Sequence, residues 1–170
     1  QTVLGPVSRN ALGITLPHEH LIIDAEILFA EPDEPRLKKR AYEPVSIKNI
    51  SWILYNQYNN LDNVRLLDEK VAIEEASYFR KAGGKTIVDV TTNGLARNLA
   101  ALKRIARATK LNIIAGAGYY VLRGEKSRAL DRKKEEELVD EIVRDITVGE
   151  KLTGVRAGII GEIGCSWPLE

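Results

Sequence analysis

The pattern that most constrains this chain is a repeated alternation of short apolar runs with amphipathic stretches of helical period. In the clearest run, residues 85–91, most side chains are β-branched, as a parallel strand covered on both faces requires. Parallel strands must be joined by crossover connections, which are usually helices. The alternation therefore predicts an α/β fold with a parallel sheet.

Four strands and at least three helices are expected. The strands are expected over residues 13–20, 85–91, 112–118 and 157–163. Asp68 and Asn98 should cap two of the helices, because their side chains can accept hydrogen bonds from free N–H groups of the first turn. A third helix, over 133–148, carries apolar residues at helical spacing. The proline-containing segment 30–63 is expected to be a long irregular loop, with a short helix within 45–55.

Two architectures place four such strands in one sheet: an open doubly wound sheet and half of a (β/α)8 barrel. The open sheet would carry a glycine-rich phosphate loop after its first strand, and this chain has none there. A full barrel takes about 250 residues, whereas this chain has 170. We therefore expect one domain, residues 1–170, that covers roughly the first four units of a (β/α)8 TIM barrel.

His18 and His20 lie at the carboxyl end of the first expected strand. Side chains two apart in a strand point to the same face, so both imidazoles should project into the barrel mouth, where barrel enzymes keep their active sites. Two converging imidazoles suit a divalent metal such as zinc. Two unrelated polar histidines are the alternative.

Glu162 stands in an otherwise apolar strand. A carboxylate there is costly unless a cation or hydrogen bonds compensate it. It could be a metal ligand, because it ends the fourth strand as the histidines end the first. The alternatives are a buried salt bridge and a side chain turned to solvent.

Polar residues also end the second and third strands. Asp89 is expected to anchor neighbouring loops or to face a helix rather than to bind metal, and Thr91 or Thr92 could line the pocket, which is the weaker of their interpretations. Tyr119 and Tyr120 follow the third strand directly, at the cavity rim, where a phenol could pack on a substrate or donate to its carbonyl oxygen. Rim packing alone is the alternative.

Charge and composition exclude several other classes of protein. The 25 Lys and Arg nearly balance the 24 Asp and Glu, so the chain lacks the excess of positive charge that binds nucleic acid. No apolar run approaches the roughly 20 residues of a membrane helix. Cys165 has no histidine left to activate it, which argues against a thiol nucleophile. We expect a cytoplasmic protein and, because the chain lacks methionine, one that is processed, engineered or part of something longer.

Five motifs, taken together, resemble a known family. They are T-V-L-G-P at 2–6, L-P-H-E-H-L at 16–21, I-V-D-V-T-T at 87–92, G-A-G-Y-Y at 116–120 and R-A-G-I-I-G-E-I-G at 156–164. In order and spacing the chain resembles the phosphotriesterase family of the amidohydrolase superfamily, most closely its phosphotriesterase-related branch. The resemblance covers nearly the whole chain.

The resemblance implies a barrel hydrolase with two divalent metals, usually zinc, and a bridging hydroxide as nucleophile. His18 and His20 match the pair that binds the more buried metal, and Glu162 matches the bridging position. The founding members carry a carbamylated lysine at that position. The carboxylate therefore makes lactone, carboxyl-ester or N-acyl amide hydrolysis at least as well supported as phosphotriester hydrolysis. Tyr120 matches an aromatic residue of the pocket wall.

The family site also takes two histidines and an aspartate from later strands, which lie beyond Glu170. The chain is therefore expected to be an N-terminal half that is inactive alone. Its open strand edges would favour association with a second half, or a homodimer. The expected substrate is a small molecule, with no nucleic-acid or membrane partner. The alternative is a noncatalytic barrel half that acts as a binding or assembly module with a vestigial metal site.

Overall fold

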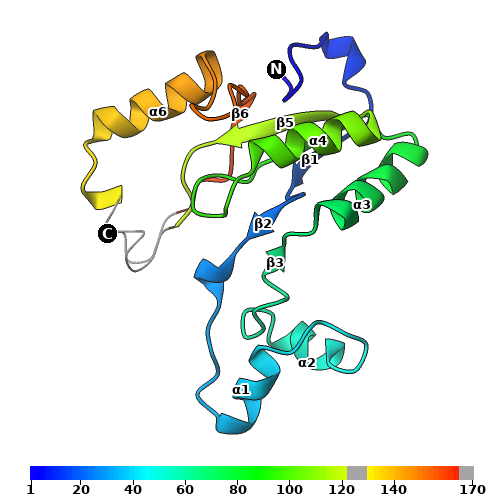
Figure 1. Cartoon of the computed structure of the whole chain (residues 1–170), viewed down its shortest axis with the longest axis vertical. Helices are drawn as coiled ribbons and strands as arrows, with labels where there is room; N and C mark the ends of the chain where they lie inside the picture. The colour runs from blue at the N-terminus through cyan, green and yellow to red at the C-terminus, as the bar shows by residue number, and fades with distance from the viewer. Residues whose placement is uncertain (122–129, 165–170) are drawn as a thin grey trace.

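A curled, four-stranded parallel sheet forms the centre of the chain, as the computed structural model shows for residues 1–121 and 130–164 (Figure 1). Its strands lie in the order β1-β4-β5-β6, so the expected strands follow one another in sequence order. They are β1 Thr15–Glu19, β4 Thr86–Asp89, β5 Asn112–Ala117 and β6 Ile159–Ile160. Each pair is parallel, which is the arrangement of the first half of a (β/α)8 barrel.

The strands are shorter than the sequence predicts, above all β6. This strand pairs only with β5, through Gly116 and Ala117. A glycine precedes it and another follows it, and both lie so close to other backbone that a Cβ atom would clash. The close approach bends the chain out of regular pairing after two residues.

Three helices cover the outer face of the sheet, α3 Glu69–Lys81, α4 Leu99–Thr109 and α6 Glu135–Thr147. The two predicted caps are confirmed: the Asp68 side chain accepts from the N–H groups of Lys70 and Val71, and the Asn98 side chain from that of Ala101. The helices α3 and α4 pack side by side against the sheet (Figure 1). The buried residues of the main core include Ala72, Ala76, Ile87, Leu102, Ile105 and Ile113.

A lobe that projects from the sheet takes up most of the segment expected to be irregular (Figure 1). It holds α1 Pro35–Ala41 and α2 Ile50–Tyr55, after the short 3-10 helix Glu26–Leu28. The antiparallel pair β2 Ile23–Asp24 and β3 Arg65–Leu66 joins the lobe to the barrel half. The short helix expected within residues 45–55 is confirmed by α2. The helix α1 was not expected, because it lies in a part of the segment that was predicted to be irregular.

Proline explains the error at α1. The prolines of segment 30–63 favoured an irregular loop, but Pro35 is the first residue of α1, and proline is favoured in the first turn of a helix, where its missing N–H is not needed. At the other end of α1, the buried Asn60 side chain donates to the carbonyls of Arg40 and Glu43, at 2.9 Å each. These bonds fix the last turn of α1 and the chain just beyond it.

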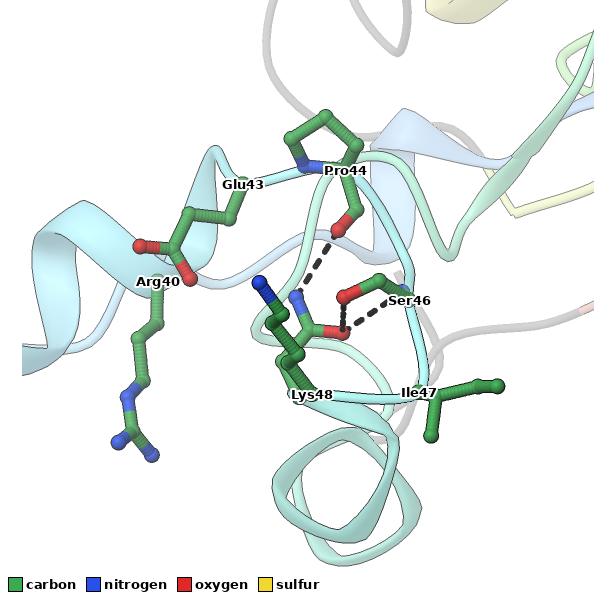
Figure 2. A pocket seen from close by; sticks show the side chains of 7 residues that line it. Arg40, Glu43, Pro44, Ser46, Ile47 and Lys48 are labelled. Atoms are coloured by element: carbon green, nitrogen blue, oxygen red, sulfur yellow. Dashed lines mark hydrogen bonds between the residues drawn. The ribbon is translucent and has the colours of Figure 1, made fainter.

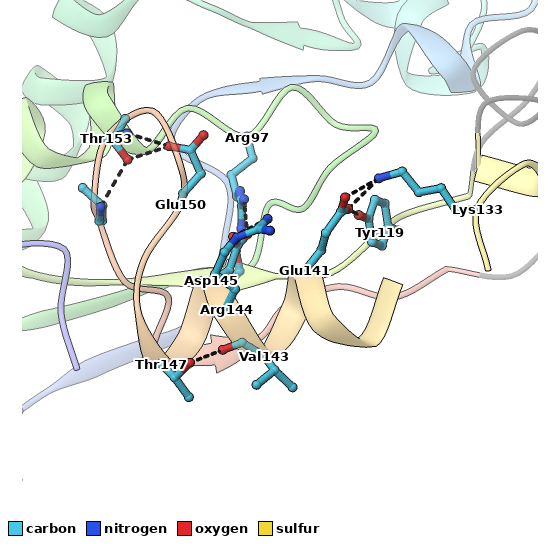
Figure 3. A network of polar contacts seen from close by, with 12 residues as sticks. Arg97, Tyr119, Lys133, Glu141, Val143, Arg144, Asp145, Thr147, Glu150 and Thr153 are labelled. Carbon is cyan, nitrogen blue, oxygen red and sulfur yellow. Dashed lines mark hydrogen bonds and ion pairs between the residues drawn. The ribbon is translucent and has the colours of Figure 1, made fainter. Parts of the chain in front are cut away.

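The burial of the side chains of helix α6 differs from what its apolar residues at helical spacing predict. Val139 and Val143 are each 50% exposed, and the residue of α6 that is buried is Asp145. Its carboxylate accepts from Arg97 at 2.6 Å, and both side chains are less than a tenth exposed (Figure 3). Arg97 also donates to the Gly116 carbonyl at 2.9 Å. The ion pair therefore ties the segment after β4 to both β5 and α6.

In the part of the chain that the structure describes, no helix combines the length and the hydrophobicity needed to cross a membrane.

The buried ion pair predicts an unequal effect of two arginine substitutions on stability. Arg97→Ala would leave the Asp145 carboxylate buried, and among the described residues its remaining ion pair is the longer one with Arg144, at 3.8 Å. Removing one partner of such a pair costs about 3 kcal/mol of the free energy of unfolding. Arg104→Ala, which breaks an exposed pair with Glu69, should cost much less. Urea unfolding of the two variants measures the difference, and equal losses would contradict the importance of the buried pair.

Candidate metal centre

The curled sheet brings His18, His20 and Glu162 together at the carboxyl ends of its two outermost strands. The two histidines come from the end of β1, and Glu162 follows β6. One potential ligand atom of each residue lies within 4.8 Å of those of the other two. The Glu162 Oε2 atom is 3.0 Å from His20 Nε2 and 3.7 Å from His18 Nε2. The structure thus assembles the predicted set, whose role as metal ligands stays a prediction.

The spacing of these atoms suits a metal of zinc's size. Ligands at zinc's usual bond lengths of about 2.0–2.1 Å in a tetrahedron lie about 3.3 Å from one another. The two nitrogen–oxygen distances, 3.0 and 3.7 Å, lie on either side of that value. Imidazole nitrogen and carboxylate oxygen are also ligands that zinc accepts. The donor set and its spacing therefore fit a divalent transition metal.

The exposure of the three side chains agrees with an accessible site. The side chains of His18, His20 and Glu162 are 59%, 23% and 30% exposed. Glu162 is thus neither a deeply buried member of an ion pair nor a side chain turned fully to solvent. A substrate or an ion could reach all three from the barrel mouth.

Residues at the end of β4 contact the set without belonging to it. Thr91 and Thr92 are buried, at 1% and 0% exposure, so the structure does not support the weaker hypothesis that one of them lines an open pocket. The Thr91 hydroxyl lies 2.9 Å from His20 Nδ1. The Thr92 hydroxyl donates to the Glu162 carbonyl, at 2.9 Å. Both threonines therefore lie behind the site and hold its residues.

Asp89 anchors a neighbouring segment, as expected. Its fully buried carboxylate accepts from the N–H groups of Leu21, at 2.8 Å, and Thr91, at 3.2 Å. Burial raises the pKa of Asp89, and the hydrogen bonds from Leu21 and Thr91 oppose that rise. The residue connects β4 to the chain that follows the histidine pair.

The two tyrosines lie near the rim in different environments. The Tyr119 hydroxyl donates to Glu141, whose carboxylate also accepts from Lys133 at 2.6 Å (Figure 3). Burial and the bond to Glu141 raise the pKa of Tyr119. Tyr120 packs against the small cluster of Ala25, Val64 and Leu95. The substrate contacts expected of both tyrosines stay predictions, and Cys165 lies outside the described residues.

Two of the surface pockets differ in their relation to this site. One, of about 740 Å³, lies in the lobe between Arg40, Glu43 and Lys48, where Asn49 bonds to Ser46 and Pro44 (Figure 2). It holds none of the three candidate ligands. The other, of about 530 Å³, includes Glu19, His20 and Leu21 in its wall and is otherwise lined by residues of the segment 62–75, from β3 to the start of α3. This hollow therefore lies between the end of β1 and the β3–α3 segment, next to His20 of the candidate site.

Known proteins that are similar to this chain extend well beyond it. The chain is 44% identical to an N-acetyltaurine hydrolase from Salmo salar and 41% identical to a phosphotriesterase-related protein from Nematostella vectensis. Each match covers 99% of this chain but only 48% and 49% of the relative. The chain thus spans about half the length of these relatives.

The fold and the sequence point to the same family. A crystal structure of a resiniferatoxin-binding protein from Rhodobacter sphaeroides is similar with a TM-score of 0.92 and 37% identity, over 99% of this chain and 47% of that protein. The model of the Phosphotriesterase family matches residues 1–170, which is the whole chain. The half barrel with its histidine pair and strand-end glutamate therefore belongs to the phosphotriesterase family.

Proposed function

We propose that this chain supplies the N-terminal half of a zinc-dependent hydrolase with a binuclear site, and that the bond it cleaves is an N-acyl amide. The observation that carries the proposal is the convergence of His18, His20 and Glu162 from opposite edges of the sheet. The similarity to an N-acetyltaurine hydrolase supports an N-acyl amide ahead of an ester, a lactone or a phosphotriester.

Each residue of the set has a distinct part in this proposal. His18 and His20 would hold one ion through imidazole nitrogens. Glu162 has two carboxylate oxygens and can therefore bridge two ions. Bound zinc would lower the pKa of a coordinated water toward about 7 and polarise the substrate's carbonyl group. The protein's own contribution is to fix the ligands at the open barrel mouth, where a small substrate can enter.

The half barrel needs a second half to complete this site. Within the described residues, β1 pairs only with β4, and β6 only with β5. Near the β6 edge, Ile159, Ile160 and Ile163 are 42%, 55% and 51% exposed. Unpaired edges and exposed apolar side chains favour association. We propose that the remaining barrel strands cover these edges and supply further ligands, and that a homodimer of this chain is a weaker substitute.

A substrate panel tests the proposed activity. N-acyl amide, carboxyl-ester, lactone and phosphotriester substrates would be offered, with zinc, to the 170-residue chain and to the complete polypeptide that its gene encodes. We expect turnover by the complete polypeptide, highest on the N-acyl amide, and none by the chain alone because its site is incomplete. Rapid turnover by the 170-residue chain would overturn the proposal that it is inactive alone.

Zinc binding tests the candidate ligands. In the complete polypeptide, His18→Ala and Glu162→Gln should each weaken zinc binding more than about tenfold, because each removes a donor from the set. Glu141→Gln is the matched control, since this carboxylate pairs with Lys133 and lies outside the set. Competition with a chelator gives the affinities. A wild-type protein that binds no zinc would favour the noncatalytic binding module instead.

A further inference from the structure

We propose that Thr91 and Thr92 are positioning residues, which fix the ring of His20 and the backbone of Glu162 so that both present their metal-binding atoms to one point. The proposal rests on the proposed function, since it concerns the same site. The two threonines are adjacent at the end of β4, a strand that holds none of the three candidate ligands.

The contact between Thr91 and His20 bears on which ring nitrogen carries the proton. The Thr91 hydroxyl lies 2.9 Å from His20 Nδ1, while His20 Nε2 faces Glu162. The proposed direction of this bond is from the His20 Nδ1–H to the Thr91 oxygen, because only then is Nε2 free to bind an ion. The Thr91 N–H in turn donates to the buried Asp89 carboxylate at 3.2 Å, which holds the threonine in place. In a neutral His20 of this form the proton lies on Nδ1, and Nε2 has a free lone pair.

That free lone pair faces another acceptor. His20 Nε2 lies 3.0 Å from Glu162 Oε2. Two acceptors at hydrogen-bond distance repel each other unless a cation lies between them. The proposed bond from His20 to Thr91 thus creates a place that favours a positive ion. Outer partners that fix the tautomer of a metal-binding histidine in this way act on metal affinity.

Thr92 acts on the other ligand through its backbone. The Thr92 hydroxyl donates to the Glu162 carbonyl at 2.9 Å, and the Glu162 N–H donates to the Val90 carbonyl at 2.8 Å. Both polar backbone groups of Glu162 are therefore held by β4 and the residues that follow it. A Cβ atom on Gly161 would lie 2.6 Å from the Val90 oxygen and 2.7 Å from Thr92 Cγ2. Glycine at position 161 is what allows this close contact.

The two contacts link strands that do not pair with each other. The ligands stand on β1 and β6, the outermost strands of the sheet, and the order β1-β4-β5-β6 places β4 and β5 between them. Thr91 contacts the β1 side, and Thr92 contacts the β6 side. A single dipeptide therefore sets the relative position of two ligands that come from far apart in the sequence.

Threonine variants of the complete polypeptide test this proposal. Thr91→Val keeps the side-chain shape but removes the hydroxyl, and should weaken zinc binding about 10–100-fold. Thr91→Ser restores the hydroxyl and should restore the affinity. Thr86→Val is the matched control, because Thr86 is as buried as Thr91 but begins β4, where its hydroxyl donates to the Leu12 carbonyl at the end of the strand away from the site.

The tautomer of His20 gives a readout that does not depend on zinc or on activity. Nitrogen-15 chemical shifts of the His20 ring, assigned by their loss in His20→Asn, should show a proton on Nδ1 in the zinc-free wild type. Thr91→Val should give a mixture of tautomers. Thr92→Val should weaken zinc binding and leave the tautomer unchanged, because Thr92 contacts the backbone of Glu162 rather than the ring of His20.

The outcomes separate this proposal from the proposed function. Wild-type affinity and an unchanged tautomer in Thr91→Val would overturn the role of Thr91. An equal loss of affinity in Thr86→Val, or no rescue by serine, would show a general packing effect and overturn it too. A wild-type protein that binds no zinc would refute the proposed function, while the tautomers of the zinc-free variants would still decide whether Thr91 orients His20.

Discussion

The curl of the parallel sheet is the constraint on which the candidate site depends. In a flat sheet with the order β1-β4-β5-β6, the outer strands would lie three strand spacings, or about 14 Å, apart. Yet Glu162 Oε2 lies 3.0 Å from His20 Nε2. The sheet must therefore curl steeply at its carboxyl end, where the Glu162 N–H reaches the Val90 carbonyl of the chain beyond β4.

Glycine makes this curl sterically possible. A Cβ atom on Gly116 would lie 2.7 Å from the Gly161 Cα atom, and one on Gly161 would clash with the Val90 oxygen. The strands β5 and β6 can thus approach the end of β4 only because these positions lack side chains. The buried pair of Arg97 and Asp145 then holds the segment after β4 against β5 and α6 (Figure 3). The two glycines and the buried ion pair together shape the carboxyl end of the sheet.

Much of this architecture could be predicted from local sequence. The four strands, the caps Asp68 and Asn98, and the set of candidate ligands all follow from apolar period, capping chemistry and strand-end position. These signals depend on neighbours in sequence, so they can be read without the fold. The absence of a phosphate loop favoured the barrel over the open sheet, and the family resemblance, confirmed by the match over residues 1–170, pointed to the same architecture.

The features that were missed depend on contacts between distant residues. Helix α1 is closed by Asn60, about 20 positions from the helix's last turn, so its sequence alone showed only prolines and charge. The apolar residues of α6 did not reveal that Asp145 would be its buried residue, because the partner is Arg97 on another segment. The role of Thr91 and Thr92 depended on where His20 and Glu162 lie. The available signal was a pair of hydroxyl residues directly after a buried strand that also contains an aspartate.

The position of the ligands has a consequence for assembly. His18 belongs to β1 and His20 follows it directly, while Glu162 follows β6, so the candidate ligands stand at the two strands whose outer edges are unpaired in the described structure. Any partner that pairs with these edges would also restrain the ligands, and a bound ion would restrain the edges, because each holds the same short segments. Binding that favours the assembled state stabilises it by a free energy that grows with the logarithm of the ligand's affinity. Metal binding and completion of the barrel would therefore reinforce each other, with β4 as the strand that connects both sides.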